Sequence, residues 1–251
     1  MGNLNTKQTV RDLLGQSQLV YRINLDVPQP LGLQKDLVGF GNPRFLHDGN
    51  ADTNPQNTPS ASGMKLSIER SATTAPGVVI GYLVAVDVQH LPIPLPDKFV
   101  LIGSFSEPDL SLLSSQGLSG TFAASVVLTY GTNVAGTTVQ IKDDTARMNL
   151  PGTSSGNSFQ YTQAFYSQVV NPGSPHHFNI VLFIERTPQA INGEGFVYAG
   201  DALVSNKSFT VNNNVSINTP IKDFRFGLGS ANGALYRASV LLHEVEIWFP
   251  D

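Results

Sequence analysis

Apolar and polar side chains alternate along the final segment of the chain, from Ser239 to Phe249. Successive side chains of a β-strand point to opposite faces, so the alternation predicts a strand with two distinct faces. The face predicted to lie in the core carries Leu241, His243, Val245, Ile247 and Phe249. The opposite face carries Val240, Leu242, Glu244, Glu246 and Trp248. A terminal strand this apolar must be paired inside a sheet, so the fold is predicted to close with it.

The same kind of pattern recurs through the chain at fairly regular spacing. It predicts about ten to twelve strands, which include residues 19–27, 64–68, 78–88, 99–105, 122–130, 137–141, 159–170, 178–184, 196–203 and 224–228. Residues 122–130 and 137–141 are expected to form a hairpin. No long helix and no strand–helix–strand alternation is visible. The sequence therefore predicts an all-β protein, an antiparallel two-sheet jelly-roll sandwich.

A few segments depart from the strand pattern. Residues 6–14 predict one short helix, and residues 106–113 predict a capped helical turn. Residues 28–62 are rich in proline and glycine and predict a long loop. Residues 91–96 hold three prolines and predict an extended connector. We expect an N-terminal arm and helix over residues 1–18 and a single β-sandwich domain over residues 19–251.

Composition limits the function classes. Charged residues make up 14% of the 251 residues, against roughly one-quarter in typical domains. The net charge is −4 and no basic cluster occurs, so nucleic acid is not an expected partner. The absence of cysteine excludes thiolate metal ligands and thiol nucleophiles. Neither an apolar signal-peptide region nor a membrane-spanning window is visible.

The last third of the chain carries a family resemblance. Its segments are His176-His-Phe-Asn-Ile-Val-Leu-Phe-Ile184, Tyr198-Ala-Gly-Asp201, Phe224-Arg-Phe-Gly227 and His243-Glu-Val-Glu-Ile-Trp248. They resemble the strands of the concanavalin A-like lectin and glucanase jelly rolls, especially the laminin-G-like branch. The resemblance covers residues 176–249 and implies a jelly-roll sandwich. The matching motifs are structural rather than catalytic, since a fold hosts many functions.

The sequence does not predict an enzyme. Glycanases of this fold carry an E-x-D-x-x-E pattern, which the resemblance implies and this chain lacks. Glu244 and Glu246 share a strand face about 7 Å apart, a spacing that fits an acid/base pair, but a solvated face is the favoured interpretation. His243 is expected to be a hydrogen-bonded core residue rather than a ligand. No catalytic residue, metal ligand set or cofactor motif is assigned.

Two regions are candidate binding sites. Sugar recognition requires an aromatic platform beside amide or carboxylate groups, and Tyr161, Gln163, Tyr166 and Gln168 offer that mixture; an ordinary sheet with one aromatic face in the core is the alternative. The polar loop at residues 47–57 presents Asp48, Asn50 and Asp52 at alternate positions, somewhat like a calcium-binding loop. A surface loop rich in Asx-turns is the other interpretation.

Trp248 completes the candidate binding residues. An indole of about 150–250 Å² does not stay in water without cost. We therefore predict that the N-terminal helix, a long loop or a neighbouring subunit covers it.

Two function classes fit these features. The first is a non-enzymatic structural or attachment component of a virus particle, most simply a bacteriophage, which binds neighbouring subunits, a second copy of itself or a cell-surface glycan. The low charge and the composition rich in glycine, serine, threonine and asparagine favour it. The second is a free-standing carbohydrate-binding module or lectin. The expected location is the virion in the first case, and extracellular or cytoplasmic in the second.

Overall fold

A computed structural model gives the fold. It describes residues 17–25, 56–60, 63–70, 82–112, 121–130, 133–141, 145–149, 157–160, 177–199, 202–211, 220–230 and 236–250. The described residues form fourteen strands and one short 3-10 helix, η1 (Val88–His90). The strands are β1 (Ser17–Asn24), β2 (Gln56–Ser60), β3 (Gly63–Arg70), β4 (Tyr82–Asp87), β5 (Lys98–Leu112), β6 (Thr121–Tyr130), β7 (Asn133–Ile141), β8 (Thr145–Asn149), β9 (Asn157–Gln160), β10 (Phe178–Arg186), β11 (Ile191–Ala199), β12 (Ala202–Val211), β13 (Ile221–Ser230) and β14 (Tyr236–Pro250).

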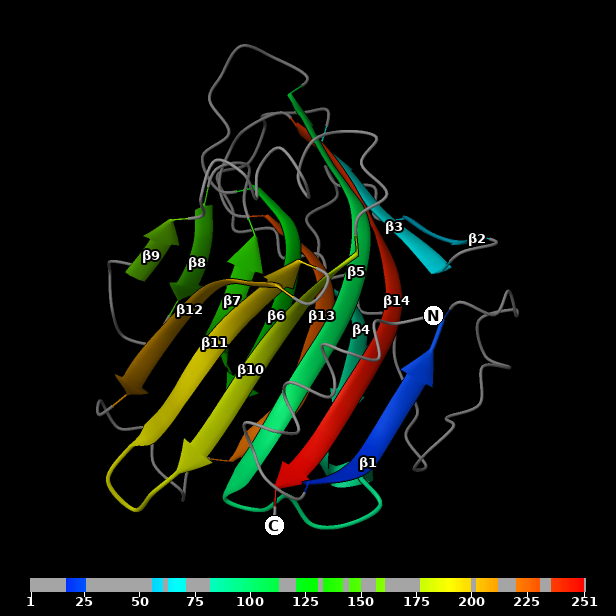
Figure 1. The fold of residues 1–251 in the computed structure, drawn as a ribbon. Coiled ribbons are helices and arrows are strands. Elements are labelled where there is room, and N and C mark those ends of the chain that lie inside the picture. Colours follow the sequence, from blue (N-terminus) through cyan, green and yellow to red (C-terminus); the bar gives the residue numbers. More distant parts are fainter. Residues whose placement is uncertain are drawn as a thin grey trace.

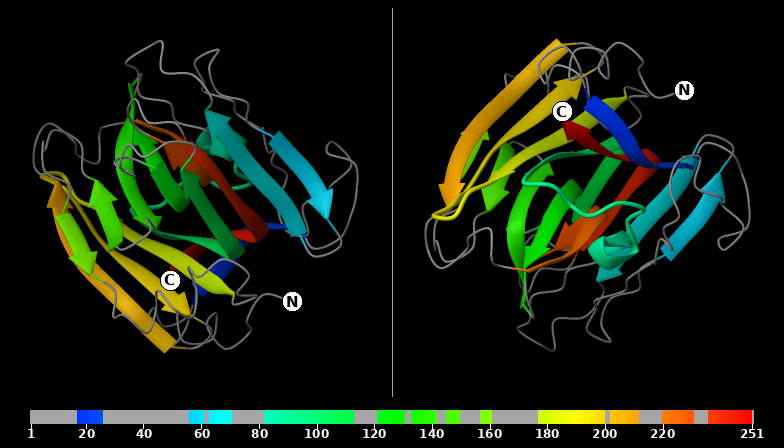
Figure 2. Two further views of the ribbon diagram at one scale, coloured as in Figure 1. Left: turned by 90° about the horizontal axis from the view of Figure 1, so that it is seen from above. Right: turned by 90° about the horizontal axis from the view of Figure 1, so that it is seen from below.

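The strands build two antiparallel sheets. The larger has eight strands in the order β12-β11-β10-β5-β14-β3-β2, with β1 also paired to β14. The smaller has six strands in the order β4-β13-β6-β7-β8-β9. The six-stranded sheet lies behind the eight-stranded one in Figure 1 and stacks against it in Figure 2. This confirms the predicted all-β jelly-roll sandwich, including the hairpin of β6 and β7, in which Tyr130 pairs with Asn133.

The core lies between the two sheets. Aromatic side chains join the layers: the rings of Phe99 on β5 and Phe224 on β13 have centroids 5.4 Å apart. Within the eight-stranded sheet, Phe105 stacks on Phe178 with centroids 5.6 Å apart. All four rings are fully buried, and each contributes roughly 1.5–3 kcal/mol from removal of apolar surface from water. We call the face of the eight-stranded sheet that meets this core the inner face.

β14 organises the eight-stranded sheet because three strands share its two edges. One edge pairs with β5 along most of its length, whereas the other pairs with β3 over residues 236–242 and with β1 over residues 244–250. His243 stands at the junction, where its carbonyl oxygen accepts a hydrogen bond of 2.7 Å from the backbone N–H of Leu25. The register against β5 shifts between Leu242 and Glu244. β14 therefore contains a β-bulge at His243.

The bulge corrects the predicted faces of the terminal strand. An extra residue in one strand turns all following side chains over to the opposite face. Val245, Ile247 and Phe249 lie in the core as predicted, but Val240 and Leu242 lie there too. The assignment of Leu241 to the core-facing set was wrong, since a strict alternation carried backwards through the bulge inverts the first half of the strand.

The predicted helical turn at residues 106–113 was also wrong. β5 continues as a strand to Leu112, paired with the first half of β14. Its irregularity is confined to Glu107, whose φ of 50° is left-handed, next to a register shift of the β5–β14 ladder. A bulge thus absorbs the Ser-Glu-Pro sequence that resembled a helix start. The predicted helix at residues 6–14 lies outside the described residues.

Within the described ranges, no helix has the length and apolar character needed to cross a membrane.

Candidate functional site

The polar and aromatic side chains of a candidate binding site lie on the outer face of the eight-stranded sheet, opposite the core. Cross-strand pairing arranges these side chains in rows that run from β12 to β1. The row nearest the C-terminus of β14 consists of Ser208, Glu194, Phe183, Val100, Trp248 and Leu19. The next row consists of Asn206, Phe196, Val181, Ile102, Glu246 and Arg22. The third consists of Leu203, Tyr198, Asn179, Ser104, Glu244 and Asn24.

The centre of this outer face is an apolar cluster. Its buried members are Val100, Ile102, Val181, Tyr198 and Trp248. Trp248 is only 4% exposed, and its indole N–H donates a hydrogen bond of 3.0 Å to Glu246 Oε2. The segments predicted to cover the indole lie outside the described residues. The indole is thus covered by the protein itself, and its N–H is engaged by Glu246.

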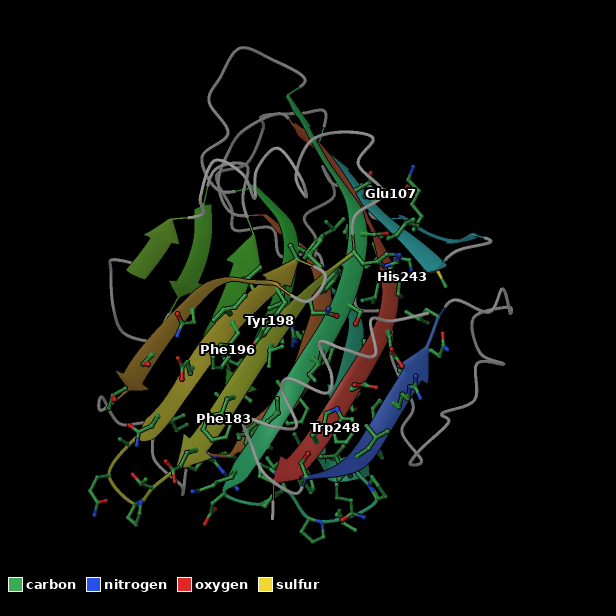
Figure 3. All side chains as sticks on the ribbon, in the orientation of Figure 1. Glu107, Phe183, Phe196, Tyr198, His243 and Trp248 are labelled. Carbon is green, nitrogen blue, oxygen red and sulfur yellow. The ribbon has the colours of Figure 1, made fainter. Side chains whose placement is uncertain are left out.

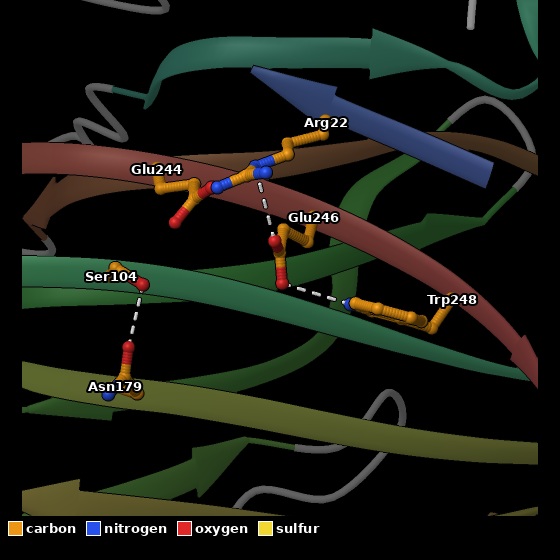
Figure 4. Close-up of polar contacts among 6 residues, drawn as sticks. All are labelled: Arg22, Ser104, Asn179, Glu244, Glu246 and Trp248. Atoms are coloured by element: carbon orange, nitrogen blue, oxygen red, sulfur yellow. Dashed lines mark hydrogen bonds and ion pairs between the residues drawn. The ribbon is translucent and has the colours of Figure 1, made fainter. Parts of the chain in front are cut away.

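Beside this cluster lies a charged group formed by Arg22, Glu244 and Glu246 (Figure 4). The guanidinium of Arg22 pairs with Glu244 through Nε, and the same nitrogen lies 3.4 Å from Glu246 Oε1. Each glutamate side chain is 2% exposed. The solvated face predicted for this pair was therefore wrong. Buried carboxylates require partners such as a cation and an N–H donor, and both are present here.

A hydrogen bond continues this polar zone toward β10. The hydroxyl of Ser104 donates to Asn179 Oδ1 at 2.6 Å, and both residues are buried. Because the two residues occupy neighbouring strands of the same row as Glu244, the polar groups fix the lateral alignment of β14, β5 and β10. The geometry here is that of a structural network.

The outer face opens toward its β12 edge. There Phe183, Glu194, Phe196 and Asn206 keep part or most of their side chains in contact with solvent; we call these four residues the β10–β12 patch. Phe196 stacks on the buried ring of Tyr198 with centroids 6.2 Å apart and an interplanar angle of 22°. Figure 3 shows Phe183, Phe196 and Tyr198 side by side on the sheet.

Polar side chains frame these rings. The amide of Asn206 donates a hydrogen bond of 2.7 Å to Glu194 Oε1. One row further along, the hydroxyl of Thr210 donates to Asn192 Oδ1 at 2.9 Å. Burial raises the pKa of the Tyr198 phenol, and the nearby carboxylate of Glu194 raises it further. The patch thus combines partly exposed rings, an amide and a carboxylate on three neighbouring strands, of which β10 and β11 are paired on both sides and β12 is the edge strand.

His243 forms a separate buried group at the bulge of β14. Its Nε2 lies 2.6 Å from Ser106 Oγ, and its ring lies 4.5 Å, centroid to centroid, from that of His177. A Cβ on Gly63 would come within 3.1 Å of His243 Nδ1, so glycine at this position makes room for the imidazole. The prediction of a buried, hydrogen-bonded histidine is confirmed, but its placement among the core-facing residues Val245 and Ile247 was wrong, because His243 sits at the bulge and packs on Ser106 instead. Across the described part of the chain, no three His, Cys, Asp or Glu residues gather as metal ligands would.

The other binding residues predicted from sequence lie outside the described residues: Tyr161, Gln163, Tyr166, Gln168, Asp48, Asn50 and Asp52. The β10–β12 patch was missed, although the sequence held a signal for it. Between Asn192 and Tyr198, every second residue is polar, acidic or aromatic, and the residues between them are Gly193, Gly195 and Val197. This is the pattern of one functional and one packed face.

Comparison with known proteins supplies structures but no family. No protein-family model matches the chain, and no curated protein matches it in sequence. Among solved structures, the binding domain of botulinum neurotoxin DC, in complex with rat synaptotagmin II, has a TM-score of 0.49 at 12% identity. The alignment covers 91% of this chain and 47% of that one, so the chain spans about half its length.

Two other similar structures match over most of their own length. Lectin I from Ulex europaeus, in complex with the methyl glycoside of α-L-fucose, has a TM-score of 0.43 at 11% identity and covers 82% of this chain and 94% of that chain. The CBM2 module of the evolved Dit of Lactobacillus casei BL23 phage J-1 has a TM-score of 0.44 at 9% identity, covering 93% and 96%. Catalytic domains of glycoside hydrolase family 131 also occur among the similar structures. The aligned regions extend well beyond the C-terminal third to which the sequence resemblance was confined.

Proposed function

We propose that the protein is a non-enzymatic glycan-binding sandwich that binds its ligand on the β10–β12 patch. The proposal rests on the pair of partly exposed rings, Phe183 and Phe196, that lies beside the hydrogen-bonded pair Glu194 and Asn206. A sugar offers an apolar C–H face and a rim of hydroxyl groups. Aromatic rings cover the first, and amide and carboxylate groups bond the second. Because the two rings lie on β10 and β11, which are paired on both sides, binding orders little additional structure there.

The burial of Glu244 and Glu246 supports a binding role over hydrolysis. A general acid and its partner must reach the glycosidic oxygen and the anomeric carbon. Both carboxylates are turned to Arg22, and Glu246 also accepts the Trp248 N–H. Incubation with the glycans that bind, followed by a reducing-sugar assay, should show no release of new reducing ends. Sustained release that is lost in Glu246→Gln would overturn the non-enzymatic part of the proposal.

For the biological setting we propose a virus particle, most simply a bacteriophage, in which this sandwich is a structural or attachment subunit. The low share of charged residues and the absence of cysteine support it, because surfaces covered by neighbouring subunits need few charges. A free-standing carbohydrate-binding module or lectin is the alternative. Light scattering at micromolar concentration separates the two: a stable trimer, hexamer or larger assembly supports the virion subunit, and a discrete monomer supports the module.

A glycan array, probed with and without calcium, tests glycan binding itself. Binding that is unchanged by a chelator fits the patch, in which no metal ligand set is described, and speaks against the loop that holds Asp48, Asn50 and Asp52. Binding that requires calcium transfers the site to the loop that holds Asp48, Asn50 and Asp52. Silence under both conditions would contradict the proposed function.

A further inference from the structure

The charges of the outer face are unevenly compensated. Lys98 lies 2.8 Å from Glu185, and Arg22 lies between Glu244 and Glu246. Both of these cations are thus already engaged by carboxylates. Glu194, in contrast, is held by the neutral amide of Asn206. A ligand that approaches the patch therefore meets one carboxylate with no described cation beside it.

Glu194 neighbours the rings of Phe183 and Phe196, so a ligand that binds on these rings lies close to its carboxylate. It pairs with Phe183 on β10 and with Ser208 on β12, and it lies two residues from Phe196 on the same face of β11. Neighbouring positions of this kind are about 5–7 Å apart. At that range the carboxylate acts on groups around it, and its effect on the pKa of the Tyr198 phenol has the same electrostatic origin.

We propose that Glu194 is a specificity-determining residue that makes the patch select glycans without carboxylate or sulfate groups, namely neutral sugars and amino sugars. This inference rests on the proposed glycan-binding function. A sugar hydroxyl or ammonium donates a hydrogen bond to Glu194, whereas an anionic substituent at the same place adds like-charge repulsion. At 5–7 Å from a partly solvated carboxylate, that repulsion reduces affinity about fivefold.

The test uses matched glycan pairs. The probes are lactose, N-acetyllactosamine, maltotriose, cellotriose and chitotriose, each with its sulfated counterpart, measured by surface plasmon resonance at low and high salt. Wild-type protein should bind the neutral member of a pair about fivefold or more tightly. Salt should narrow the difference, because it screens repulsion at a surface. This wild-type comparison needs no variant and so does not depend on a substitution being tolerated.

A charge-matched pair of variants assigns the effect to its residue. Glu194→Gln keeps the shape and an acceptor for Asn206 and should bring the two members of each pair to within about twofold of one another. Glu107→Gln changes the net charge equally, at an exposed position far along β5, and should leave the discrimination at its wild-type value.

The outcomes separate the two proposals. Neutral binding with equal or tighter sulfated binding overturns the selectivity and leaves the glycan-binding function in place. Discrimination that persists in Glu194→Gln also overturns it, because some other group must then repel the anion. Absence of binding to every probe, neutral and sulfated, contradicts the glycan-binding function, and the inference falls with it.

Discussion

The two faces of the eight-stranded sheet use the same strands for different purposes. The inner face is a continuous apolar layer that packs against the second sheet. Along each strand, residues of the outer face alternate with residues of the inner face. The outer face nevertheless contains a salt-bridged triad, an apolar cluster and a partly exposed aromatic patch. The comparison teaches that burial alone does not mark the core in this fold. What separates the faces is that the inner face is apolar throughout, whereas the outer face also buries charged and polar side chains that are paired with one another.

Among substitutions in the inner face, Phe178→Ala should lower the free energy of unfolding most. This ring is fully buried and stacks on Phe105, so its removal leaves a cavity and should cost about 3–5 kcal/mol of unfolding free energy. Urea denaturation followed by fluorescence measures the loss. Phe183→Ala on the outer face of the same strand is the matched control and should cost clearly less, because its ring is half-buried. Equal losses would contradict the division of β10 into a core face and a surface face.

The outer triad should be the next most sensitive feature. Arg22→Met removes the cation between Glu244 and Glu246 and leaves two buried carboxylates without it. Breaking a buried ion pair by removing one partner costs about 3 kcal/mol or more. Urea denaturation again measures the free energy of unfolding. Combining Arg22→Met with Glu244→Gln should recover part of the loss; a double variant that is less stable than the single one would show that the triad does not act as a charge-balanced group.

Gly103→Ala should have a smaller effect on the inner face. A Cβ there would lie 2.6 Å from Phe105 Cε2 and 3.1 Å from Val126 Cγ2, so the Phe105 ring must shift within a packed core. Such overpacking costs about 1–3 kcal/mol. Differential scanning calorimetry should show a lower melting temperature. A variant that melts at the wild-type temperature would mean that the layers are not closely packed at this position.

The smallest expected effect concerns pH. The pKa of Tyr198 is raised above its ordinary value of 10.0 by burial and by Glu194. Below pH 10 the phenol is neutral in both the folded and the unfolded chain. Above pH 10 the unfolded chain loses this proton first, so stability falls as the pH rises toward the folded-state pKa. Ultraviolet titration should show a late-ionising phenol that is absent in Tyr198→Phe. An unchanged late phase in that variant would contradict the assignment.

The alternation of side chains predicted most of the fold and little of the site, for identifiable reasons. Strands such as β10 and β14 are apolar enough that the hydrophobic effect predicts their place inside a sheet. The bulge at His243 has no such signal, because it depends on β3 and β1 meeting at one edge of β14. The burial of Glu244 and Glu246 was missed for the same reason. Arg22, which is 222 residues from Glu244 in the sequence, stabilises them.

The β10–β12 patch was not predicted because aromatic content was judged without knowledge of the strand neighbours. Tyr161 and Tyr166 stand in the segment richest in rings and amides, and they remain a prediction. Phe196 acquires its amide partner only when β12 brings Asn206 beside Glu194. Pairing across strands, which the sequence of one strand does not reveal, creates the mixture of ring, amide and carboxylate.

The claim that the ligand binds on the outer face of the eight-stranded sheet is tested most directly by isothermal titration calorimetry of Phe196→Ala. The ligand is the neutral glycan that the wild-type protein binds most tightly. Removing the exposed ring while Tyr198 remains buried should weaken binding about tenfold or more, with the melting temperature nearly unchanged. Tyr166→Ala, from the competing sequence-based candidate, should bind as wild type does. Full binding by Phe196→Ala together with lost binding by Tyr166→Ala would contradict the assignment of the ligand to the outer face of the eight-stranded sheet.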